Sequence, residues 1–391
     1  MISFNLACSW PRNHQMPETT KEKDLLEVRV ATSDEVQQSR ETWNTLAAAM
    51  KYPTIFCSWE WIHTWWNHFG IAHEPAILFI YRRGELTGIL PLFLENRREA
   101  VYPFPRRLGF CGSTKLYPDH LDIICAVDDA KQCLDSAFGF LTADFRRWDI
   151  LQLSFIAEDS NLFSWLRTNR DRIKWRIKGR TVAPYLNLAG SFDDYMGSFT
   201  SRQRYPVQSR RKKLLERHAM RYVKCDFGDL SECLTSVFDL HAQRAVAKRI
   251  DSTFTGDEIF RFHVDLLKEI QDKDWVWIRF LKTGEEIIAV FYGFVFGNRV
   301  FYYQLGHDPG WDAFSPGMVM LNEAIQEAFA GNHLEFNFLQ GEEEYKYKWT
   351  KDQRILYDFS VYQNNMRSRA LYTKDILKQA LKKLLERHPR A

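Results

Sequence analysis

The segment from Trp275 to Asp308 constrains the fold more than any other part of the sequence. It reads WVWIRFLKTGEEIIAVFYGFVFGNRVFYYQLGHD, three long apolar runs separated by KTGE and GN. Runs rich in β-branched and aromatic residues, joined by such short turns, predict three antiparallel strands. A helix should follow, because apolar residues then recur at helical spacing: Met318, Leu321, Ile325 and Phe329. The stretch HLEFNFLQ alternates as a strand, so the expected order is three strands, a helix and a strand.

The remainder of the chain repeats this mixture on a smaller scale. Residues 76–95 have the pattern of a β-hairpin, and helices are expected near 130–146, 230–247 and 257–270. Strands and helices mixed in this order indicate an α/β class, a mixed α+β fold. A chain of 391 residues is long enough for two domains of similar size. We predict the following division: a polar leader at 1–25, an N-terminal domain at 26–190, a C-terminal domain at 191–365 and a basic amphipathic helix at 366–391.

Composition excludes several classes of protein. Hydrophobic residues make up 45% and charged residues 26% of the chain, which is typical of a globular protein and excludes a disordered one. The formal net charge of +3 gives no support to a DNA-binding role. The seven cysteines show no regular spacing and no C-x-x-C pair, so we expect free thiols in a reducing compartment and no metal site. No run approaches the roughly 18 apolar residues of a membrane span, and a cytoplasmic location is predicted.

Ser315, Pro316 and Gly317 stand at the start of the predicted helix and admit two interpretations. Ser and Pro favour helix starts for local reasons, with Ser315 as the N-cap and Pro316 in the first turn. Alternatively, the free N–H groups and the dipole of a helix N-terminus bind phosphate, and a glycine there lets a ligand approach the backbone. The residues alone leave both interpretations open.

The segment FYYQLGHDPGWDAFSPG, followed by the helix, the strand and GEEEYKYKW, resembles the BioF2-like or CelD-like acetyltransferase family. This family is a branch of the GCN5-related N-acetyltransferase (GNAT) superfamily. Gly341, Tyr345, Lys346 and Trp349 match its final G-x-x-x-Y-K-x-x-W motif. Four further stretches match other family motifs, so that the resemblance extends from Phe56 to Trp349: FCSWEWIHTWWNHFG, GILPLFLE, SRQRYPVQSRRKKL and LHAQR. The layout is also similar to that of the FemAB-type peptidoglycan aminoacyltransferases.

This resemblance implies two tandem GNAT-like domains, each a mixed, mostly antiparallel sheet flanked by helices. It implies transfer of an acyl group from acetyl-CoA or another acyl-CoA to an amine of a small molecule, sugar or glycan precursor, as in polysaccharide biosynthesis, without a metal ion. Two alternatives remain: a tRNA-dependent FemAB-like aminoacyltransferase, and a non-catalytic partner in exopolysaccharide assembly. Only the first alternative brings tRNA as a partner, and the chain is expected to be a monomer or a homodimer.

The resemblance and the side-chain chemistry together nominate the site residues. As catalytic groups we predict His241, whose ordinary pKa of about 6.5 suits proton removal, with Tyr345 and Asp119. The predicted cofactor-binding residues are Tyr303, Gln304, Ser315, Gly317, Met318 and Lys346. The predicted substrate-binding residues are Arg244, Asp122 and Arg211.

Structural roles compete with these assignments. His241 could be an ordinary helix histidine, Asp119 and Asp122 could cap turns, and the basic run containing Arg211 could be a solvated helix face. Asn337 stands where the family commonly has a carboxylate, so a base role at that position is in doubt. For the basic helix at 366–391, packing on the domain is favoured over contact with a membrane surface.

Overall fold

The computed structural model describes residues 26–95, 105–225, 230–249 and 251–387, except the side chains of 382–387. The predicted polar leader at 1–25 lies outside these residues. Among the described residues, no helix has both the length and the apolar character required to cross a bilayer.

The elements up to residue 190 alternate between helices and strands. The helices are α1 (Ser33–Gln38), α2 (Arg40–Ala48), α3 (Trp59–Phe69), α4 (Ala130–Ala143) and α5 (Asn161–Thr168), with short 3-10 turns at Ile55–Cys57, Gly70–Ala72 and Val127–Asp129. The strands are β1 (Glu27–Val30), β2 (His73–Arg82), β3 (Glu85–Glu95), β4 (Arg107–Phe110), β5 (Ile124–Cys125), β6 (Ile150–Ala157) and β7 (Lys174–Asn187).

The elements after residue 190 include the predicted meander. The helices are α6 (Phe192–Gly197), α7 (Ser201–His218), α8 (Leu230–Lys248), α9 (Asp257–Ile270), α10 (Pro316–Ala330) and α11 (Met366–Arg387), with 3-10 turns at Gln271–Lys273, Pro309–Phe314 and Lys346–Lys348. The strands are β8 (Arg221–Lys224), β9 (Val276–Thr283), β10 (Glu286–Phe296), β11 (Arg299–His307), β12 (Glu335–Asn337) and β13 (Gln353–Tyr362).

The described strands form one 13-stranded sheet in the order β1-β2-β3-β4-β6-β13-β7-β12-β11-β10-β9-β8, with β5 paired to β3. The same unit occurs twice in it. β2, β3 and β4 are antiparallel neighbours, and β6 lies parallel to β4 after the crossover through α4. β9, β10 and β11 repeat this, and β12 lies parallel to β11 after α10. The predicted mixed fold, with mostly antiparallel strands flanked by helices, is confirmed, and the two units are joined in one continuous sheet.

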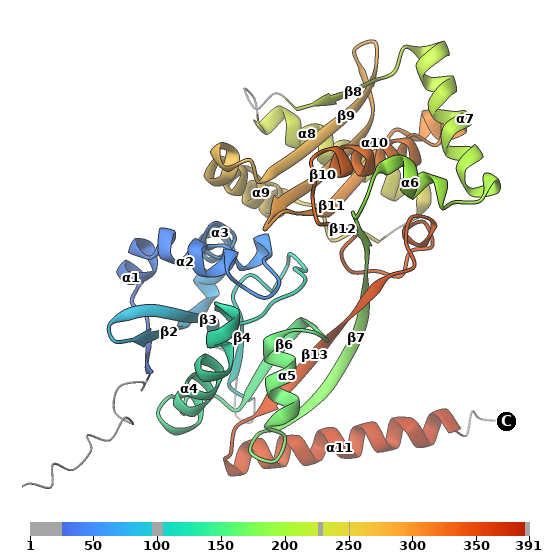
Figure 1. Cartoon of the computed structure of the whole chain (residues 1–391). Helices are drawn as coiled ribbons and strands as arrows, with labels where there is room; N and C mark the ends of the chain where they lie inside the picture. Colours follow the sequence, from blue (N-terminus) through green and yellow to red (C-terminus); the bar gives the residue numbers. More distant parts are fainter. Residues whose placement is uncertain (1–25, 96–104, 226–229, 250, 388–391) are drawn as a thin grey trace, which may run out of the picture.

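The two halves share strands. β13 follows the second unit in sequence but pairs with β6 and β7 of the first. β7 in turn pairs with β12 through Tyr185, Leu186 and Asn187. Figure 1 shows the long strands β7 and β13 running between a lobe of N-terminal and a lobe of C-terminal elements. The domain boundaries given above remain a prediction.

Apolar clusters cover the two faces of the part of the sheet formed by β9, β10 and β11. In the larger cluster, Trp61 of α3 contacts Phe262 of α9 and Phe294 of β10, with ring centroids 5.2 and 6.0 Å apart. The other cluster lies under α10 and includes Phe291 of β10 and Phe336 of β12. Because helices from both halves share the larger core, the N-terminal elements are held against the face that carries α8 and α9.

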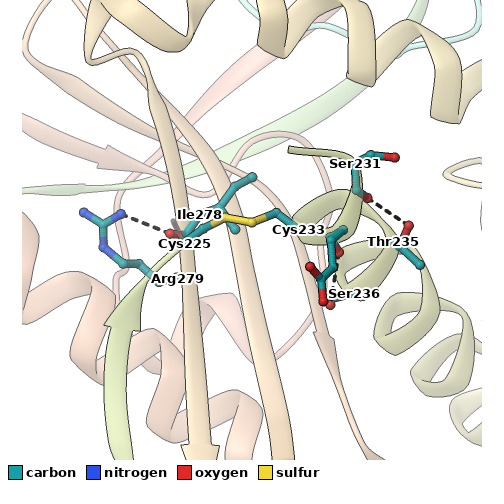
Figure 2. The surroundings of a disulfide bond; sticks show 8 residues. Cys225, Ser231, Cys233, Thr235, Ser236, Ile278 and Arg279 are labelled. Atoms are coloured by element: carbon teal, nitrogen blue, oxygen red, sulfur yellow. Dashed lines mark hydrogen bonds between the residues drawn. A yellow bond between two sulfur atoms is a disulfide. The ribbon is translucent and has the colours of Figure 1, made fainter. Parts of the chain in front are cut away.

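Cys225 and Cys233 form a disulfide between the end of β8 and α8 (Figure 2). The prediction of free thiols throughout is therefore wrong for this pair. Spacing could not reveal the bond, because it depends on β8 pairing with β9, where the Cys225 N–H donates to the Ile278 carbonyl at 3.1 Å. That pairing and the return of α8 bring the two cysteine Cα atoms to 6.5 Å. The free, buried cysteines are Cys57, Cys111, Cys125 and Cys133, and Cys8 lies outside the described residues.

Removing this bond by replacing both cysteines with alanine should lower the free energy of unfolding by about 2.5 kcal/mol. The bond joins positions 8 residues apart, and closing such a loop restricts the unfolded chain. Urea denaturation with and without a reductant measures the effect. A reductant should destabilise the natural chain and leave the double variant unchanged, whereas equal stability of the natural chain in both conditions would contradict the prediction.

Candidate functional site

β11 and β12 lie side by side only briefly. They pair in parallel from Arg299 and Glu335 to Phe301 and Asn337. β11 then continues to His307 beside β10, with a bulge at Tyr303, whereas the chain after β12 turns towards β7, where the Phe338 N–H donates to the Pro184 carbonyl at 2.9 Å. The two backbones separate, and a cavity of ≈ 360 Å³, here called the central cavity, opens between them.

The central cavity gathers residues that are far apart in the sequence. Its walls come from the loop at 115–117, from α8, from the segment 251–259, from β11 and from the segment 338–346. The structure brings six of the predicted site residues together here: His241, Arg244, Tyr303, Gln304, Tyr345 and Lys346. Polar residues that were not singled out line it as well: Lys115, Tyr302, Ser252, Gln340 and Glu343.

Gly306 positions α8 against β11. A Cβ at this residue would lie 2.5 Å from both the His241 nitrogen and the Leu240 carbonyl carbon, which are backbone atoms. Only a glycine therefore allows the helix to approach the strand this closely. This contact places His241 and Arg244 in the cavity wall.

His241 is buried and neutral at neutral pH. Its Nε2 lies 2.7 Å from the Ser252 Oγ. Burial, with a smaller contribution from the charge of Arg244, lowers the pKa of His241 to about 4. The ring is therefore unprotonated at pH 7 and can accept a proton, and its partner Ser252 lines the cavity beside it.

Arg244 is a half-buried cation in the same wall. Within the described part of the chain, its guanidinium forms no hydrogen bond or ion pair. An unpaired guanidinium facing a cavity is suited to binding a carboxylate or a phosphate.

Tyr345 and Tyr302 form a phenol pair in the lining of the same cavity. Their hydroxyl oxygens lie 3.1 Å apart. Burial raises the pKa of Tyr345 well above its ordinary value and raises the pKa of Tyr302 to about 12. Both phenols therefore hold their protons at neutral pH, and Tyr345 is able to act as a proton donor.

Lys346 supports the turn that forms the cavity floor. Its Nζ donates to the carbonyl groups of Leu339 at 3.2 Å and Gln340 at 2.7 Å, and it pairs with Glu343 at 3.0 Å. Burial lowers the pKa of Lys346. With three protein partners, this ammonium has little capacity left for a ligand phosphate.

Asp119 is buried next to the cavity. Its Oδ1 accepts a hydrogen bond from the Gln340 side chain at 3.0 Å, and its Oδ2 has no partner among the described residues. Burial raises the pKa of Asp119 to about 7, although the charge of Lys346 acts in the opposite direction. Nearby Lys115, Tyr117 and His120 have positive φ angles of 72, 49 and 59°, which non-glycine residues rarely adopt. Such strained backbone often occurs at functional sites.

Asp122 and Arg211 do not reach the central cavity. Asp122 accepts the backbone N–H groups of Asn161 and Leu162 at 2.8 and 2.9 Å, so its carboxylate caps the start of α5. Arg211 of α7 binds Glu323 of α10 through two hydrogen bonds of 2.6 and 3.1 Å.

The start of α10 differs from the expectation in one respect. Ser315 precedes the helix in a left-handed conformation, with φ 50° and ψ 57°, and its side chain makes no capping hydrogen bond. The expected Ser315 side-chain cap is therefore wrong, because this backbone turns the side chain away from the first turn. A Cβ at Gly317 would lie 3.2 Å from the Leu305 Cδ2 and 3.3 Å from the His307 Nδ1, so close packing of α10 on β11 already accounts for the glycine.

A second cavity of ≈ 360 Å³ lies beside the start of α10. Met318 lines it together with Arg202 and Val207 of α7 and with Tyr347 and Lys348. Two cations and an aromatic ring at the start of a helix make this cavity suitable for an anionic ligand.

Asn337 is explained by its neighbours. Its amide nitrogen donates to the Tyr52 hydroxyl at 2.8 Å and lies 2.9 Å from the His120 Nε2. Glu335, two residues away, is held by Arg354 at 2.9 and 2.8 Å. A carboxylate at residue 337 would repel Glu335 and could not donate to His120, which burial keeps neutral by lowering its pKa.

The cavity residues that were not predicted from the sequence belong to no clear local sequence pattern. Alternation along β11 places Tyr302 and Tyr303 on opposite faces, but the cavity opens at the edge of the strand, where both reach it. Ser252 and Gln340 lie in loops. Gly306 was the sequence feature that could have indicated the cavity, because a glycine inside a strand often marks a place where another backbone approaches closely.

Comparisons with known proteins agree with this geometry. Residues 201–347 match the family described as an acetyltransferase (GNAT) domain. The fold is similar to that of FemX, with a TM-score of 0.59 at 12% identity over 89% of this chain and 99% of FemX. It is also similar to a conserved protein of unknown function from Bacteroides thetaiotaomicron VPI-5482, with a TM-score of 0.53 at 11% identity over 87% of this chain and 100% of that one. No curated protein matches the sequence. Residues 201–347, which contain the separating strands and most of the central cavity, are thus the part of the chain that is similar to a GNAT acetyltransferase domain.

Proposed function

We propose that the chain is an N-acyltransferase of the BioF2-like or CelD-like type. It would move an acyl group, acetyl in the first instance, from an acyl-CoA to an amine of a small molecule, sugar or glycan precursor. One observation carries this proposal: within the GNAT segment, β11 and β12 separate over a cavity lined by His241, Arg244 and Tyr345. A neutral base, a free cation and a protonated phenol around one cavity are the groups that acyl transfer to an amine requires.

In the proposed reaction, the amine nitrogen bonds to the thioester carbonyl carbon and the C–S bond breaks. The nitrogen loses a proton and the leaving thiolate gains one. His241 accepts the amine proton, with the Ser252 hydroxyl as the nearest relay. Asp119, whose pKa of about 7 is closer to neutral pH, is linked to the cavity through Gln340 and is the second candidate base. Tyr345 supplies the proton to the thiolate.

For the acyl-CoA we propose the start of α10 and the second cavity. The backbone N–H group of Gly317 and the side chains of Arg202 and Lys348 would hold its phosphates, with Met318 in the wall beside them. The bound molecule supplies an activated acyl group. Tyr303 and Gln304 would then lie along the acyl arm in the central cavity.

For the acceptor we propose an amine that also carries a carboxylate or phosphate, because Arg244 is unpaired in the wall. A nucleotide-linked amino sugar has this chemistry. Asp122 and Arg211 take no part in this proposal, since backbone N–H groups and Glu323 already engage them.

Arg244→Ala should raise the KM for an anionic acceptor about 10- to 100-fold and leave kcat nearly unchanged. The reason is that a charge that binds the acceptor equally in its ground and transition states contributes to binding alone. Steady-state kinetics with a colorimetric assay for released CoA thiol measures both constants. Arg217→Ala, which removes an exposed arginine at the end of α7, is the control and should change neither. An unchanged KM in Arg244→Ala would contradict the assignment.

The donor is tested by isothermal titration with acetyl-CoA and with longer acyl-CoAs. Binding of at least one, followed by thiol release in the presence of an amine acceptor, supports the proposal. Absence of binding to all of them, with transfer from aminoacyl-tRNA, would replace it by the tRNA-dependent alternative. If the chain bound neither donor, and if His241→Ala left a cellular phenotype unchanged, a role as a non-catalytic partner in exopolysaccharide assembly would be favoured.

A further inference from the structure

α11 contacts the rest of the molecule mainly through polar side chains, together with the ring of Tyr372, which packs on Tyr362 with ring centroids 5.1 Å apart. The Ser368 Oγ donates to the Asp149 carbonyl at 2.8 Å. Asp375 accepts from the Tyr362 hydroxyl and pairs with Lys178, and Gln379 accepts from Arg176. Ser368, Asp375 and Gln379 are 7 and 4 residues apart and so share one side of the helix. In Figure 1, α11 lies along the lower edge of the molecule, below β7 and β13.

The apolar face of α11 points away from the protein. Met366, Leu377 and Leu381 are 88%, 63% and 58% exposed. They are 11 and 4 residues apart, close to whole turns of a helix, and so form one outward stripe. An ordinary surface helix buries this stripe in the core and exposes its polar side. Because the stripe on α11 faces away from the core, Leu377 and Leu381 remain exposed and can contact a partner surface.

The charges beside the stripe are positive. Lys374 and Lys378 are exposed on α11 and, within the described residues, form no ion pair. The sequence continues with Lys382, Lys383 and Arg387, against a single acidic residue, Glu386. Two copies of such a helix would repel one another, and an anionic surface would attract each of them.

A basic groove of ≈ 400 Å³ runs next to α11, between α5 and β7. Arg167 and Arg170 line it and lie over the rings of Phe163 and Trp175 at 5.7 and 4.9 Å, without an ion pair in the described part of the chain. Asp171 is the one acidic residue in the sequence from 167 to 180. The positive surface therefore extends from the helix onto the sheet.

We propose that α11 and the adjacent basic groove dock on an anionic lipid bilayer, with α11 lying in the plane of the interface. Leu377 and Leu381 would enter the boundary between headgroups and acyl chains, and Lys374, Lys378 and the groove arginines would meet the phosphates. The charges alone would also suit a nucleic acid, but an RNA surface gives exposed leucines no place to be buried. A lipid surface matches both the charges and the leucines.

Vesicle flotation of the full chain tests this proposal, independently of any transferase activity. The chain should float with vesicles of phosphatidylcholine and phosphatidylglycerol, stay behind with phosphatidylcholine alone, and lose binding as salt rises. The variants L377Q/L381Q and K374E/K378E should each lower partitioning by about tenfold or more. The matched control is I71Q/V246Q, which changes residues that are 93% and 80% exposed on other elements and should bind as the natural chain does.

Several outcomes would overturn the proposal. Equal binding to both vesicle types would contradict the proposed need for anionic lipid. Binding by L377Q/L381Q at the natural level would contradict the proposed role of the exposed leucines. Binding to RNA that needs the lysines and not the leucines, with no binding to vesicles, would assign the surface to nucleic acid. A dimer seen by light scattering that L377Q/L381Q converts to a monomer, without lipid binding, would assign it to a second copy of the chain.

Discussion

Replacing Gly306 with alanine is expected to lower the free energy of unfolding by about 3 kcal/mol or more. The added Cβ would lie 2.5 Å from two backbone atoms of α8, the His241 nitrogen and the Leu240 carbonyl carbon. Backbone atoms cannot rotate away as a side chain can, so the whole helix must move off β11. The same movement should displace His241 and Arg244 from the cavity wall, and acceptor binding should weaken together with stability. Urea denaturation and the acceptor KM measure the two effects.

Gly139→Ala provides the control for this prediction. Gly139 is exposed in the middle of α4, and a Cβ there meets no atom within 4 Å. Alanine should therefore be tolerated or stabilise the chain by about 0.5–1 kcal/mol, because it is the better helix former. If Gly306→Ala were as stable as Gly139→Ala, close packing of α8 on β11 would not be what positions the cavity wall.

Elements with a strong local pattern could be predicted from the sequence. α9 begins at Asp257 and ends at Ile270 as predicted, and the meander appears as β9, β10 and β11. Such patterns depend on residues close together in the chain, where the apolar period reflects the face that becomes buried. The mixed fold followed from their order.

Pairings between distant segments could not be predicted in this way. β13 was not predicted, and nothing within its sequence indicates that β6 and β7 will flank it. The disulfide between Cys225 and Cys233 likewise depends on how β8 and α8 return to each other. The strand pairing and the disulfide both depend on how the whole sheet is assembled, whereas the sequence shows only the local structural preferences of its residues.

His241, Arg244 and Tyr345, for which side-chain type and family motif agreed, lie together at the central cavity, and their roles remain predictions. The candidate site was not predicted where a charged residue had a partner that the sequence does not show. Asp122 and Arg211 have suitable chemistry for a ligand, but backbone N–H groups and Glu323 occupy them. Whether a charge is free depends on tertiary contacts, and so the sequence alone does not reveal it.

Asp119→Asn is expected to raise the free energy of unfolding by about 4 kcal/mol at pH 8 and to leave it nearly unchanged at pH 4. Burial raises the pKa of Asp119 from 3.8 to about 7 in the folded chain. The folded state therefore keeps a proton that the unfolded state has already lost. The stability contributed by this carboxyl is complete below pH 3.8, declines as the pH rises, and levels off above about 7. Asparagine never ionises and keeps an oxygen for the Gln340 amide, so the difference between variant and natural chain should follow this window.

Asp122→Asn separates this effect from a general preference for amides. Asp122 is also buried, but its two oxygens accept backbone N–H groups of Ile123, Asn161 and Leu162. Burial also raises the pKa of Asp122, to about 6, so replacing this carboxyl by an amide removes an unfavourable ionisation at pH 8. An amide NH2 cannot accept a hydrogen bond, however, and the lost acceptor costs about 1–3 kcal/mol, which offsets that gain. Asp122→Asn should therefore change the free energy of unfolding at pH 8 much less than Asp119→Asn does. Equal stabilisation by both substitutions, or no stabilisation by Asp119→Asn, would contradict the assigned pKa of Asp119. The kcat of Asp119→Asn then decides its role: a fall of about 100-fold would support Asp119 as a base, because only the carboxylate can take a proton, and an unchanged kcat would leave that function to His241.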